Sequence, residues 1–438
     1  MARRRTYTPL NVYLNGRLVG RLNRQTSGAI DFKYDSSWLG WRDTMPISLS
    51  LPLREDRYIG DPVLAVFDNL LPDNDLIRSR ISQNVHAGGV DAFSLLSVVG
   101  RDCAGALQFL PDGIDPNAPG VVKGKPIDDS DIASILGNLI SVPLGLSEDE
   151  DFRISLAGAQ EKTALLSWNG RWHKPLGSTA TTHILKPQIG HLPNGIDLSY
   201  SVENEFLCLK LTKELGLPSA EVEIATFEGK KVLVVERFDR IWTKDHRLLR
   251  LPQEDCCQAL GVHPTHKYEA DGGPGIPDLL HLLKASDNPE EDQKMFLKAL
   301  VVFWLIGATD GHAKNFSIHL KPGGGFRLAP IYDVISAQPS VDAGQIRQNK
   351  MKLAMSVGKN RHYAMSTVMP RHFIQTVECS DIAVSLVEDV FDTIFSKADE
   401  AVRNVLTGLP NEFPKKIAHS ILDGFENRLR SLEAGSSG

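Results

Sequence analysis

The sequence predicts an α+β fold of two lobes, in which a sheet-rich lobe is followed along the chain by a mostly helical lobe. Three observations predict this fold. Strand-like runs that flank two-residue turns recur up to residue 240. After residue 240, apolar residues recur at helical spacing. The chain has 438 residues, which is more than one ordinary hydrophobic core supports, so we expect several domains.

The first domain is expected at residues 1–125. Residues 10–22 alternate between apolar and polar side chains around Asn15-Gly16, a pair that predicts a β-hairpin because both residues tolerate positive φ. Residues 63–81 have helical spacing. The stretch 111–125 is rich in Pro, Gly and Asp and predicts a linker at the domain boundary.

Residues 126–240 are expected to form the sheet-rich lobe. Asn169-Gly170 and Glu228-Gly229 each lie between two strand-like runs and predict two more hairpins. Residues 183–186 form a short apolar run typical of a strand, and residues 201–215 have helical spacing. The lobe is therefore expected to be a sheet with one inserted helix.

Residues 241–434 are expected to form the helical lobe, and residues 435–438 a flexible tail. The predicted helices span residues 276–283, 290–307, 381–407 and 415–432, and one strand pair within residues 316–328 interrupts them. A small sheet-rich lobe before a larger helical lobe is the layout of protein-kinase-like folds. Here an extra N-terminal subdomain precedes both lobes.

The composition excludes several classes of protein. Apolar residues make up 42% of the chain and charged residues 23%, which is typical of globular proteins and not of disordered or collagen-like chains. The net charge is −6, whereas domains that bind nucleic acid through their own surface are usually strongly basic. We therefore expect any contact with DNA to need a local patch or a basic partner.

Cysteine usage and hydropathy predict a cytoplasmic protein. The five cysteines include no Cys-x-x-Cys pair, which argues against a disulfide scaffold and against a zinc site. We find no signal peptide and no apolar run near the ~20 residues that a membrane helix needs.

Asp310 and Asn315 form the most informative pair. They lie five positions apart, after an apolar helix and before a strand. Protein kinases need an Asp to accept the proton of the substrate hydroxyl and an Asn to hold Mg²⁺, and this spacing presents both from one loop. The spacing alone is weak, because an Asx-turn after a helix would place the same residues there.

Asp333 strengthens this interpretation. It follows directly after the predicted strand pair, where kinases carry a second Asp that binds Mg²⁺ at the phosphates. The alternative is that Asp333 caps a helix. The order of loop, strand, turn, strand and Asp is more demanding than either Asp alone, so we favour metal binding by oxygen ligands that suit Mg²⁺.

Lys186 is the candidate cation for the phosphates. It ends a predicted strand, and a helix that carries Glu203 and Glu205 follows, so that either Glu could pair with it. A solvated edge-strand lysine is the alternative. We favour the phosphate role because the order of Lys, Glu helix and Asp loop is the kinase order.

Residues 155–162 are the candidate phosphate-binding loop. They contain one glycine and match neither common glycine-rich nucleotide motif, so spacing alone does not identify the loop. Glu236, Arg237 and Phe238 end an apolar strand at the junction of the lobes, where backbone groups could bind the adenine edge.

These segments together resemble the HipA family of bacterial kinase toxins. The resemblance runs from about residue 10 to about residue 425 and rests on several motifs in order: FDNLLPD at 67–73, FRISLAGAQEKTAL at 152–165, THILK at 182–186, VERFDR at 235–240, LPQED at 251–255 and IGATDGHAKNF at 306–316.

The resemblance implies roles for individual residues. Asp310 would be the catalytic base, Asn315 and Asp333 would hold Mg²⁺, and Lys186 would contact a phosphate of ATP. Ser155 matches the autophosphorylation serine of the family. The nucleotide site would be lined by Ala157, Gly158, Ala159, Gln160, Glu161, Lys162, Glu236, Arg237, Phe238, His312, Ala313, Lys314, Asn315, Tyr332 and Asp333.

The resemblance also implies a cellular role. The family phosphorylates serine or threonine in proteins of the aminoacyl-tRNA synthetase class, notably glutamyl-tRNA synthetase, which inhibits translation and promotes persistence. Its members pair with a HipB-type antitoxin and repress their own operon. We expect operator DNA to be bound mainly through the antitoxin, because the segment where some members carry a basic cluster contains Glu378 and Asp381.

Two other classes of function fit the same residues. A kinase of small molecules or lipids would need the same phosphate and metal side chains. A non-catalytic, DNA-bound corepressor could keep the fold, although the presence of Lys186, Asp310 and Asp333 counts against it.

Overall fold

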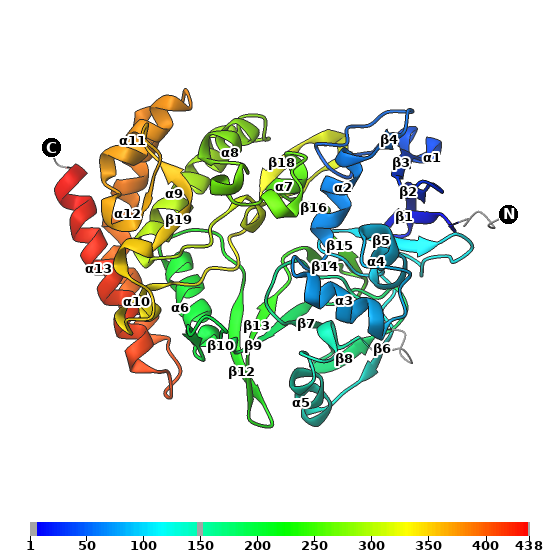
Figure 1. Cartoon of the computed structure of the whole chain (residues 1–438), viewed down its shortest axis with the longest axis horizontal. Coiled ribbons are helices and arrows are strands. Elements are labelled where there is room, and N and C mark those ends of the chain that lie inside the picture. Colours follow the sequence, from blue (N-terminus) through cyan, green and yellow to red (C-terminus); the bar gives the residue numbers. More distant parts are fainter. Residues whose placement is uncertain (1–6, 147–151, 437–438) are drawn as a thin grey trace.

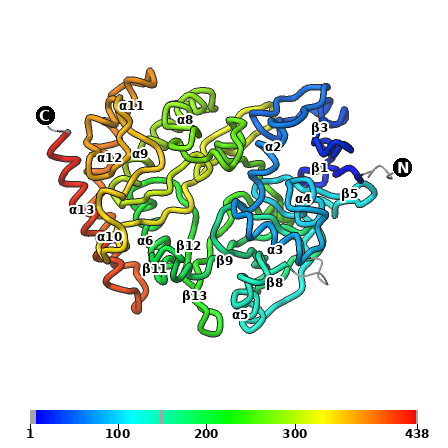
Figure 2. Tube along the Cα trace, viewed as in Figure 1, coloured from blue at the N-terminus to red at the C-terminus, as the bar shows by residue number. Residues whose placement is uncertain are grey.

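The computed structural model describes residues 7–146 and 152–436. The acidic run at residues 148–151 and the last two residues of the predicted tail lie outside these ranges. The N-terminal sheet and helix α13 (Lys415–Ser436) lie at opposite ends of the molecule, and the sheet-rich lobe lies between them (Figure 1; Figure 2). Among the described residues, no helix is long and apolar enough to cross a bilayer.

The N-terminal domain is built on an antiparallel five-stranded sheet in the order β4-β3-β2-β1-β5. The predicted first hairpin is confirmed, since Asn15 and Gly16 have φ of 46° and 80°. The strands are β1 (Leu10–Leu14), β2 (Arg17–Arg24), β3 (Ile30–Tyr34), β4 (Tyr58–Ile59) and β5 (Leu107–Pro111). The helices are α1 (Ser36–Leu39), α2 (Asp61–Phe67), α3 (Asp75–Asn84) and α4 (Ala92–Val99).

The second domain is a six-stranded sheet in the order β12-β13-β9-β7-β8-β6. Its strands are β6 (Gly124–Pro126), β7 (Thr163–Trp168), β8 (Arg171–Pro175), β9 (His183–Pro187), β12 (Val222–Phe227) and β13 (Lys230–Glu236). Both predicted hairpins are confirmed, with positive φ at Asn169, Gly170, Glu228 and Gly229. The predicted domain boundary at residue 125 falls inside β6, which already pairs with β8.

Two helices cover this sheet, because alternate residues of a strand point to opposite faces. On β13, Val232 and Val234 share a cluster with α5 (Asp129–Gly137), while Leu233 and Val235 join the main core together with α6 (Ser201–Glu214). Helix α6 is the inserted helix that the sequence predicts. Two short strand pairs flank the sheet: β10 (Gly190–His191) with β11 (Asp197–Leu198), and β14 (Arg240–Trp242) with β15 (Leu248–Arg250).

The third domain packs its helices around the buried helix α9 (Pro289–Ile306), which contacts α8 (Ile276–Leu283), α12 (Val384–Thr407) and α13 (Figure 1). The other helices are α7 (Cys256–Ala259), α8 (Ile276–Leu283), α10 (Gln338–Asp342), α11 (Pro370–Cys379) and α12 (Val384–Thr407). The strands are β16 (Gln253–Asp255), β17 (Ser317–Leu320), β18 (Phe326–Leu328), β19 (Lys352–Val357) and β20 (His362–Ala364). Helix α13 continues through Ser436, so the start of the predicted flexible tail is helical.

The predicted strand pair at residues 316–328 is confirmed as β17 and β18, and β16 adds a third strand that the sequence does not predict. Short 3₁₀ helices complete the chain: η1 (Asp68–Leu70), η2 (Pro143–Gly145), η3 (Pro264–His266), η4 (Glu269–Asp271), η5 (Ala313–Asn315), η6 (Pro322–Gly324), η7 (Gln348–Lys350) and η8 (Met365–Thr367).

A buried charge cluster joins the N-terminal domain to the residues that follow β13. Asp102, after α4, lies 3.0 Å from Arg240, 2.8 Å from Arg250 and 3.4 Å from Arg237. Burial alone would raise the pKa of Asp102, but the three guanidinium groups and the backbone N–H of Thr181 hold it well below its usual range. The domain interface therefore depends on the ionised carboxylate of Asp102, together with Asp239, which pairs with Arg237 and Arg240.

We predict that Asp102→Asn destabilises the protein strongly. The substitution keeps the shape of the side chain but leaves buried arginines short of a counter-charge, which costs about 3–5 kcal/mol. Urea denaturation checks this. Asp112→Asn is the control, because Asp112 pairs with Arg21 at an exposed site, where solvent screening limits a pair to about 0–1 kcal/mol. Equal small losses for the two variants would contradict the prediction.

Candidate active site

A cleft of about 800 Å³ lies where the three domains meet. Of the predicted nucleotide-site residues, all but Ala313 line it, and so does Asp310; Ala313 is buried beneath its wall. The cleft thus brings together side chains from β9, from the loop before β17 and from the segment after β18. The roles that the sequence suggests for these residues remain predictions.

Lys186 ties the two lobes together at the base of the cleft. Its Nζ lies 2.7 Å from Oε1 of Glu205 on α6 and 2.8 Å from Oδ1 of Asp333. Burial alone would lower the pKa of Lys186, but the two carboxylates outweigh burial and raise it. Glu203, the other predicted partner, pairs with Lys231, because side chains two positions apart on a helix point in different directions.

Asp333 is held in an unusual backbone conformation. Its φ is 57°, a left-handed value that costs energy for a residue other than glycine and that often occurs at functional sites. Burial raises its pKa, but Lys186 and Lys162 together hold it well below the usual range. About a third of its side chain is open to solvent. Asp333 therefore presents an ionised carboxylate to the cleft.

The loop before β17 carries Asp310 and Asn315. The Asn315 side chain donates through Nδ2 to the backbone oxygen of Asp310 at 2.7 Å, which fixes the two residues relative to one another. The Asp310 carboxylate is 56% exposed at the mouth of the cleft. It accepts a 2.6 Å hydrogen bond from the hydroxyl of Tyr268, a residue to which the sequence assigns no role. His312 is buried beside them, edge-on to the Tyr268 ring.

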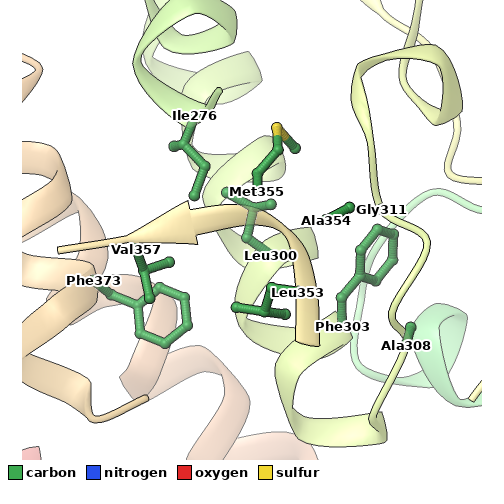
Figure 3. Close-up of a pocket in the computed structure, with 10 residues that line it drawn as sticks. All are labelled: Ile276, Leu300, Phe303, Ala308, Gly311, Leu353, Ala354, Met355, Val357 and Phe373. Carbon is green, nitrogen blue, oxygen red and sulfur yellow. The ribbon is translucent and has the colours of Figure 1, made fainter. Parts of the chain in front are cut away.

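The same loop rests on the core of the third domain through Gly311. Figure 3 shows Phe303 of α9 beside Gly311, among the apolar side chains that lie behind the loop. A Cβ atom at Gly311 would lie 2.6 Å from Cδ2 of Phe303. The absence of a side chain therefore sets how closely the Asp310 loop approaches α9.

The side chain of Lys314 binds residues of the N-terminal domain. Its Nζ donates to the backbone oxygen and to Oδ1 of Asn69, at 2.8 and 2.7 Å, and lies 3.3 Å from Asp73. Its second acidic neighbour is Asp255, whose pKa is raised to about 6 by burial despite Lys314. The sequence predicts Lys314 in the nucleotide site, and the structure places its ammonium group in a buried network within the wall of the cleft.

The loop at residues 155–162 crosses the opposite wall. Gly158 has φ of 102° and would bring a Cβ within 2.6 Å of Nζ of Lys162, so glycine is required there. Lys162 donates to the backbone oxygen of Ala157 at 2.6 Å. Burial, aided by the nearby Lys186, lowers the pKa of Lys162 to about 8. Two closely spaced lysines on this side of the cleft suit a polyanionic ligand.

Ser155 lies outside the cleft. It is fully buried, and its hydroxyl donates to the backbone oxygen of Leu70 in the N-terminal domain at 2.8 Å. The strand-like contact of Pro72 with Gly158 holds the same loop against this domain. Phosphate could therefore reach Ser155 only after the loop separates from the N-terminal domain.

The segment that follows β13 contributes one aromatic wall. Phe238 lies 5.7 Å from Tyr332, ring centre to ring centre, and Tyr332 donates its hydroxyl to the backbone oxygen of Lys314. The Arg237 side chain points away from the predicted adenine pocket, because Asp239 and Asp102 bind it in the charge cluster. At Arg237 only the backbone is left to contact a nucleotide.

Among the described residues, no group of three or more His, Cys, Asp or Glu side chains could hold a metal ion by itself. A kinase needs fewer protein ligands for its metal ion, because phosphate oxygens of the nucleotide complete the coordination. Asp333 offers ionised oxygens, and Asn315, bound through its Nδ2, keeps its amide oxygen as an acceptor. This oxygen-only donor set fits Mg²⁺.

Several cleft residues are not among those that the sequence predicts. Asn69 and Asp73 belong to a segment that the motif analysis identifies, but without a role. Nothing in the sequence connects Tyr268 with Asp310 across 42 positions. The buried residues Glu254 and Asp255 are likewise recognisable only as part of a family motif.

Comparisons with known proteins identify relatives over most of the chain. Models of the HipA N-terminal domain and the HipA-like C-terminal domain match residues 10–110 and 154–406. The putative kinase Y4mE of Sinorhizobium fredii is 38% identical over 358 residues, covering 81% of this chain and 82% of the relative. The serine/threonine-protein kinase toxin HipA of Shewanella oneidensis is 30% identical over 364 residues, covering 80% and 78%.

A solved structure shares the fold over the whole chain. A chain in the complex of HipA, HipB and operator DNA from Shewanella oneidensis superposes with a TM-score of 0.81. The match has 24% sequence identity and covers 98% of both chains. It therefore supports the α+β, kinase-like architecture independently of the sequence motifs.

We predict a pH-dependent stability caused by Glu254. Burial raises its folded pKa from 4.5 to about 8. The fold therefore favours the protonated form, and its contribution to stability is complete below about pH 4.5 and is lost as the pH rises towards 8. The loss has a limiting slope of about 1.4 kcal/mol per pH unit. Urea denaturation from pH 5 to 8 should show this slope in the wild type.

The slope should be smaller in Glu254→Gln, which cannot ionise, by up to about 1.4 kcal/mol per pH unit. Asp255, whose pKa is raised to about 6, contributes its own pH dependence in both proteins. The exposed Glu223 on β12 gives a control, since Glu223→Gln should keep the wild-type pH dependence. Parallel curves for the wild type and Glu254→Gln would contradict the assignment.

We also predict that Gly311→Ala lowers the free energy of unfolding by about 1–3 kcal/mol, because the added methyl group overpacks a site against Phe303. Thermal or urea denaturation measures the loss. Gly88→Ala is the matched control, since the nearest atom to its added Cβ is 4.0 Å away. If both alanine variants unfold like the wild type, the loop is not fixed by this contact.

Proposed function

This chain belongs to the HipA family, and we propose that it is an ATP-dependent serine/threonine-protein kinase with Asp310 as its catalytic base. The observation that carries the proposal is the meeting of Lys186, Asp310, Asn315 and Asp333 in one cleft, with Lys186 ion-paired to Asp333. Relatives named as kinases support it.

Each residue then has a physical task. Lys186 and Lys162 supply positive charge for the phosphates of ATP, and the backbone around Gly158 forms the loop that lies over them. Phe238 and Tyr332 offer an aromatic wall for the adenine, and the backbone at residues 236–238 can bind its edge. Asp310 accepts the proton of the acceptor serine, since its exposed carboxylate can be reached from outside the cleft.

Asn315 and Asp333 would hold Mg²⁺, which would supply positive charge to neutralise the charge that develops on the phosphates during transfer. In the absence of ligands, Lys186 balances the Asp333 carboxylate. Because this carboxylate is ionised well below neutral pH, it needs no proton to be removed before it binds a cation.

The proposal extends to regulation at Ser155. Its phosphorylation would add about −1.5 to −2 charges to the loop that lies over the ATP phosphates. A phosphate cannot be accommodated at the buried position beside Leu70, so the modified loop would have to leave the N-terminal domain. The displaced loop would no longer bind ATP, which would inactivate the enzyme.

We further propose the cellular role of the family for this chain: a cytoplasmic toxin that phosphorylates an aminoacyl-tRNA synthetase, with glutamyl-tRNA synthetase as the first candidate, and so inhibits translation and promotes persistence. A HipB-type antitoxin would bind it, and the pair would repress their operon through DNA contacts made mainly by the antitoxin. The solved HipA, HipB and operator DNA complex of the relative supports this partner.

The test is mass spectrometry of the purified chain and glutamyl-tRNA synthetase after incubation with ATP and Mg²⁺. We expect phosphate on a serine of the synthetase and on Ser155. Asp310→Asn should lower the transfer rate by about 10²–10⁴-fold, since it removes the general base. Asp392→Asn, on an exposed face of α12, should transfer at the wild-type rate.

Two results would overturn the proposal. Labelled ATP that marks a metabolite or lipid in a cell lysate, and no protein, would point to a small-molecule kinase. Full growth arrest by an Asp310→Gln variant expressed in cells would point to a non-catalytic corepressor.

A further inference from the structure

Tyr268 lies outside the sequence motifs, but its side chain contacts the carboxylate of Asp310. Its hydroxyl donates to Oδ1 of Asp310 at 2.6 Å, and its ring meets His312 edge-on with 4.8 Å between ring centres. His312 itself is buried, and its Nε2 lies 3.7 Å from the same Oδ1. Two side chains therefore face one oxygen of the carboxylate.

The residues on either side of Tyr268 are anchored. Lys267 binds Asp73 of the N-terminal domain at 2.8 Å. Glu269 accepts hydrogen bonds of 2.5 and 2.9 Å from the backbone N–H and hydroxyl of Ser356 on β19. Because both neighbours are fixed to different parts of the protein, the backbone that carries the Tyr268 side chain is anchored next to Asp310.

The other oxygen of the carboxylate, Oδ2, has no hydrogen-bond partner within residues 7–146 and 152–436, and the Asp310 side chain is 56% exposed. We propose that Tyr268 is a positioning residue for phosphoryl transfer, whose hydroxyl holds Oδ1 so that Oδ2 faces the acceptor hydroxyl. This inference rests on the proposed kinase function and adds to it the oxygen that acts and the group that orients it.

In the proposed step, phosphate moves from ATP to the acceptor serine. The oxygen of the acceptor serine forms a bond to the γ-phosphorus of ATP while the bond from that phosphorus to the bridging oxygen of ADP breaks. The acceptor proton passes to Oδ2 of Asp310 and leaves to solvent after ADP and phosphoprotein depart. Tyr268 keeps its own proton throughout.

Tyr268→Phe tests the inference, because it removes the hydroxyl and keeps the ring against His312. We expect kcat for transfer from ATP to glutamyl-tRNA synthetase to fall about 10- to 100-fold, the loss typical of a misplaced catalytic group. The KM for ATP should stay within about twofold, because Tyr268 acts on the base and not on the nucleotide. Tyr58→Phe is the control: it also removes a phenol hydroxyl, which donates to Pro52 in the N-terminal domain.

A double-mutant cycle separates positioning from general damage. In an Asp310→Asn background, Tyr268→Phe should have no further effect on kcat, since the group that it orients is already lost. An equal loss in both backgrounds, or a wild-type kcat for Tyr268→Phe alone, would overturn the inference. The proposed function fails by a different result, namely that Asp310→Asn itself transfers phosphate at the wild-type rate.

Discussion

The ion pairs of Lys186 hold the site together. One ammonium group on β9 binds Glu205 of α6, 19 positions later, and Asp333 of the segment after β18, 147 positions later, so three separate elements must meet within 3 Å of one nitrogen. Lys186 also offsets the strained backbone of Asp333, whose φ of 57° would be unfavourable without a fixed side chain. Loss of Lys186 would leave the buried carboxylate of Glu205 without its ion-pair partner and Asp333 with only Lys162 to balance its charge, which is more costly than the loss of an exposed pair.

The N-terminal domain contributes residues to the walls of the cleft. Asn69 and Asp73 bind Lys314 of the loop before β17, Pro72 pairs with Gly158 of the loop at residues 155–162, and Leu70 accepts the hydroxyl of Ser155. These contacts all come from one short segment around η1. Any movement of this segment would therefore change both walls of the cleft together.

The sequence predicts the hairpins correctly, because the residues that determine a hairpin are adjacent in the chain. Asn15-Gly16 and Asn169-Gly170 specify hairpins through their own backbone preferences, and the chain order of Lys186, Asp310 and Asp333 predicts a shared cleft. Contacts between distant segments leave no such signal. The turn of Arg237 away from the nucleotide depends on Asp102, 135 positions earlier, and the burial of Ser155 depends on a backbone oxygen, 85 positions earlier. The pairing of Tyr268 with Asp310 is hidden for the same reason.

For the proposed kinase function, the exposed and buried positions within the site favour a protein acceptor. Lys186, Asn315 and Lys162 are buried, and burial strengthens their interactions with phosphate charge. Asp310 is more than half exposed at the mouth, held there by Tyr268 and by the close approach of Gly311 to Phe303. An enzyme that acts on a small molecule gains from enclosing the acceptor as well. A base at the mouth of the cleft instead suits a serine that stays attached to a large partner, because only the hydroxyl has to enter.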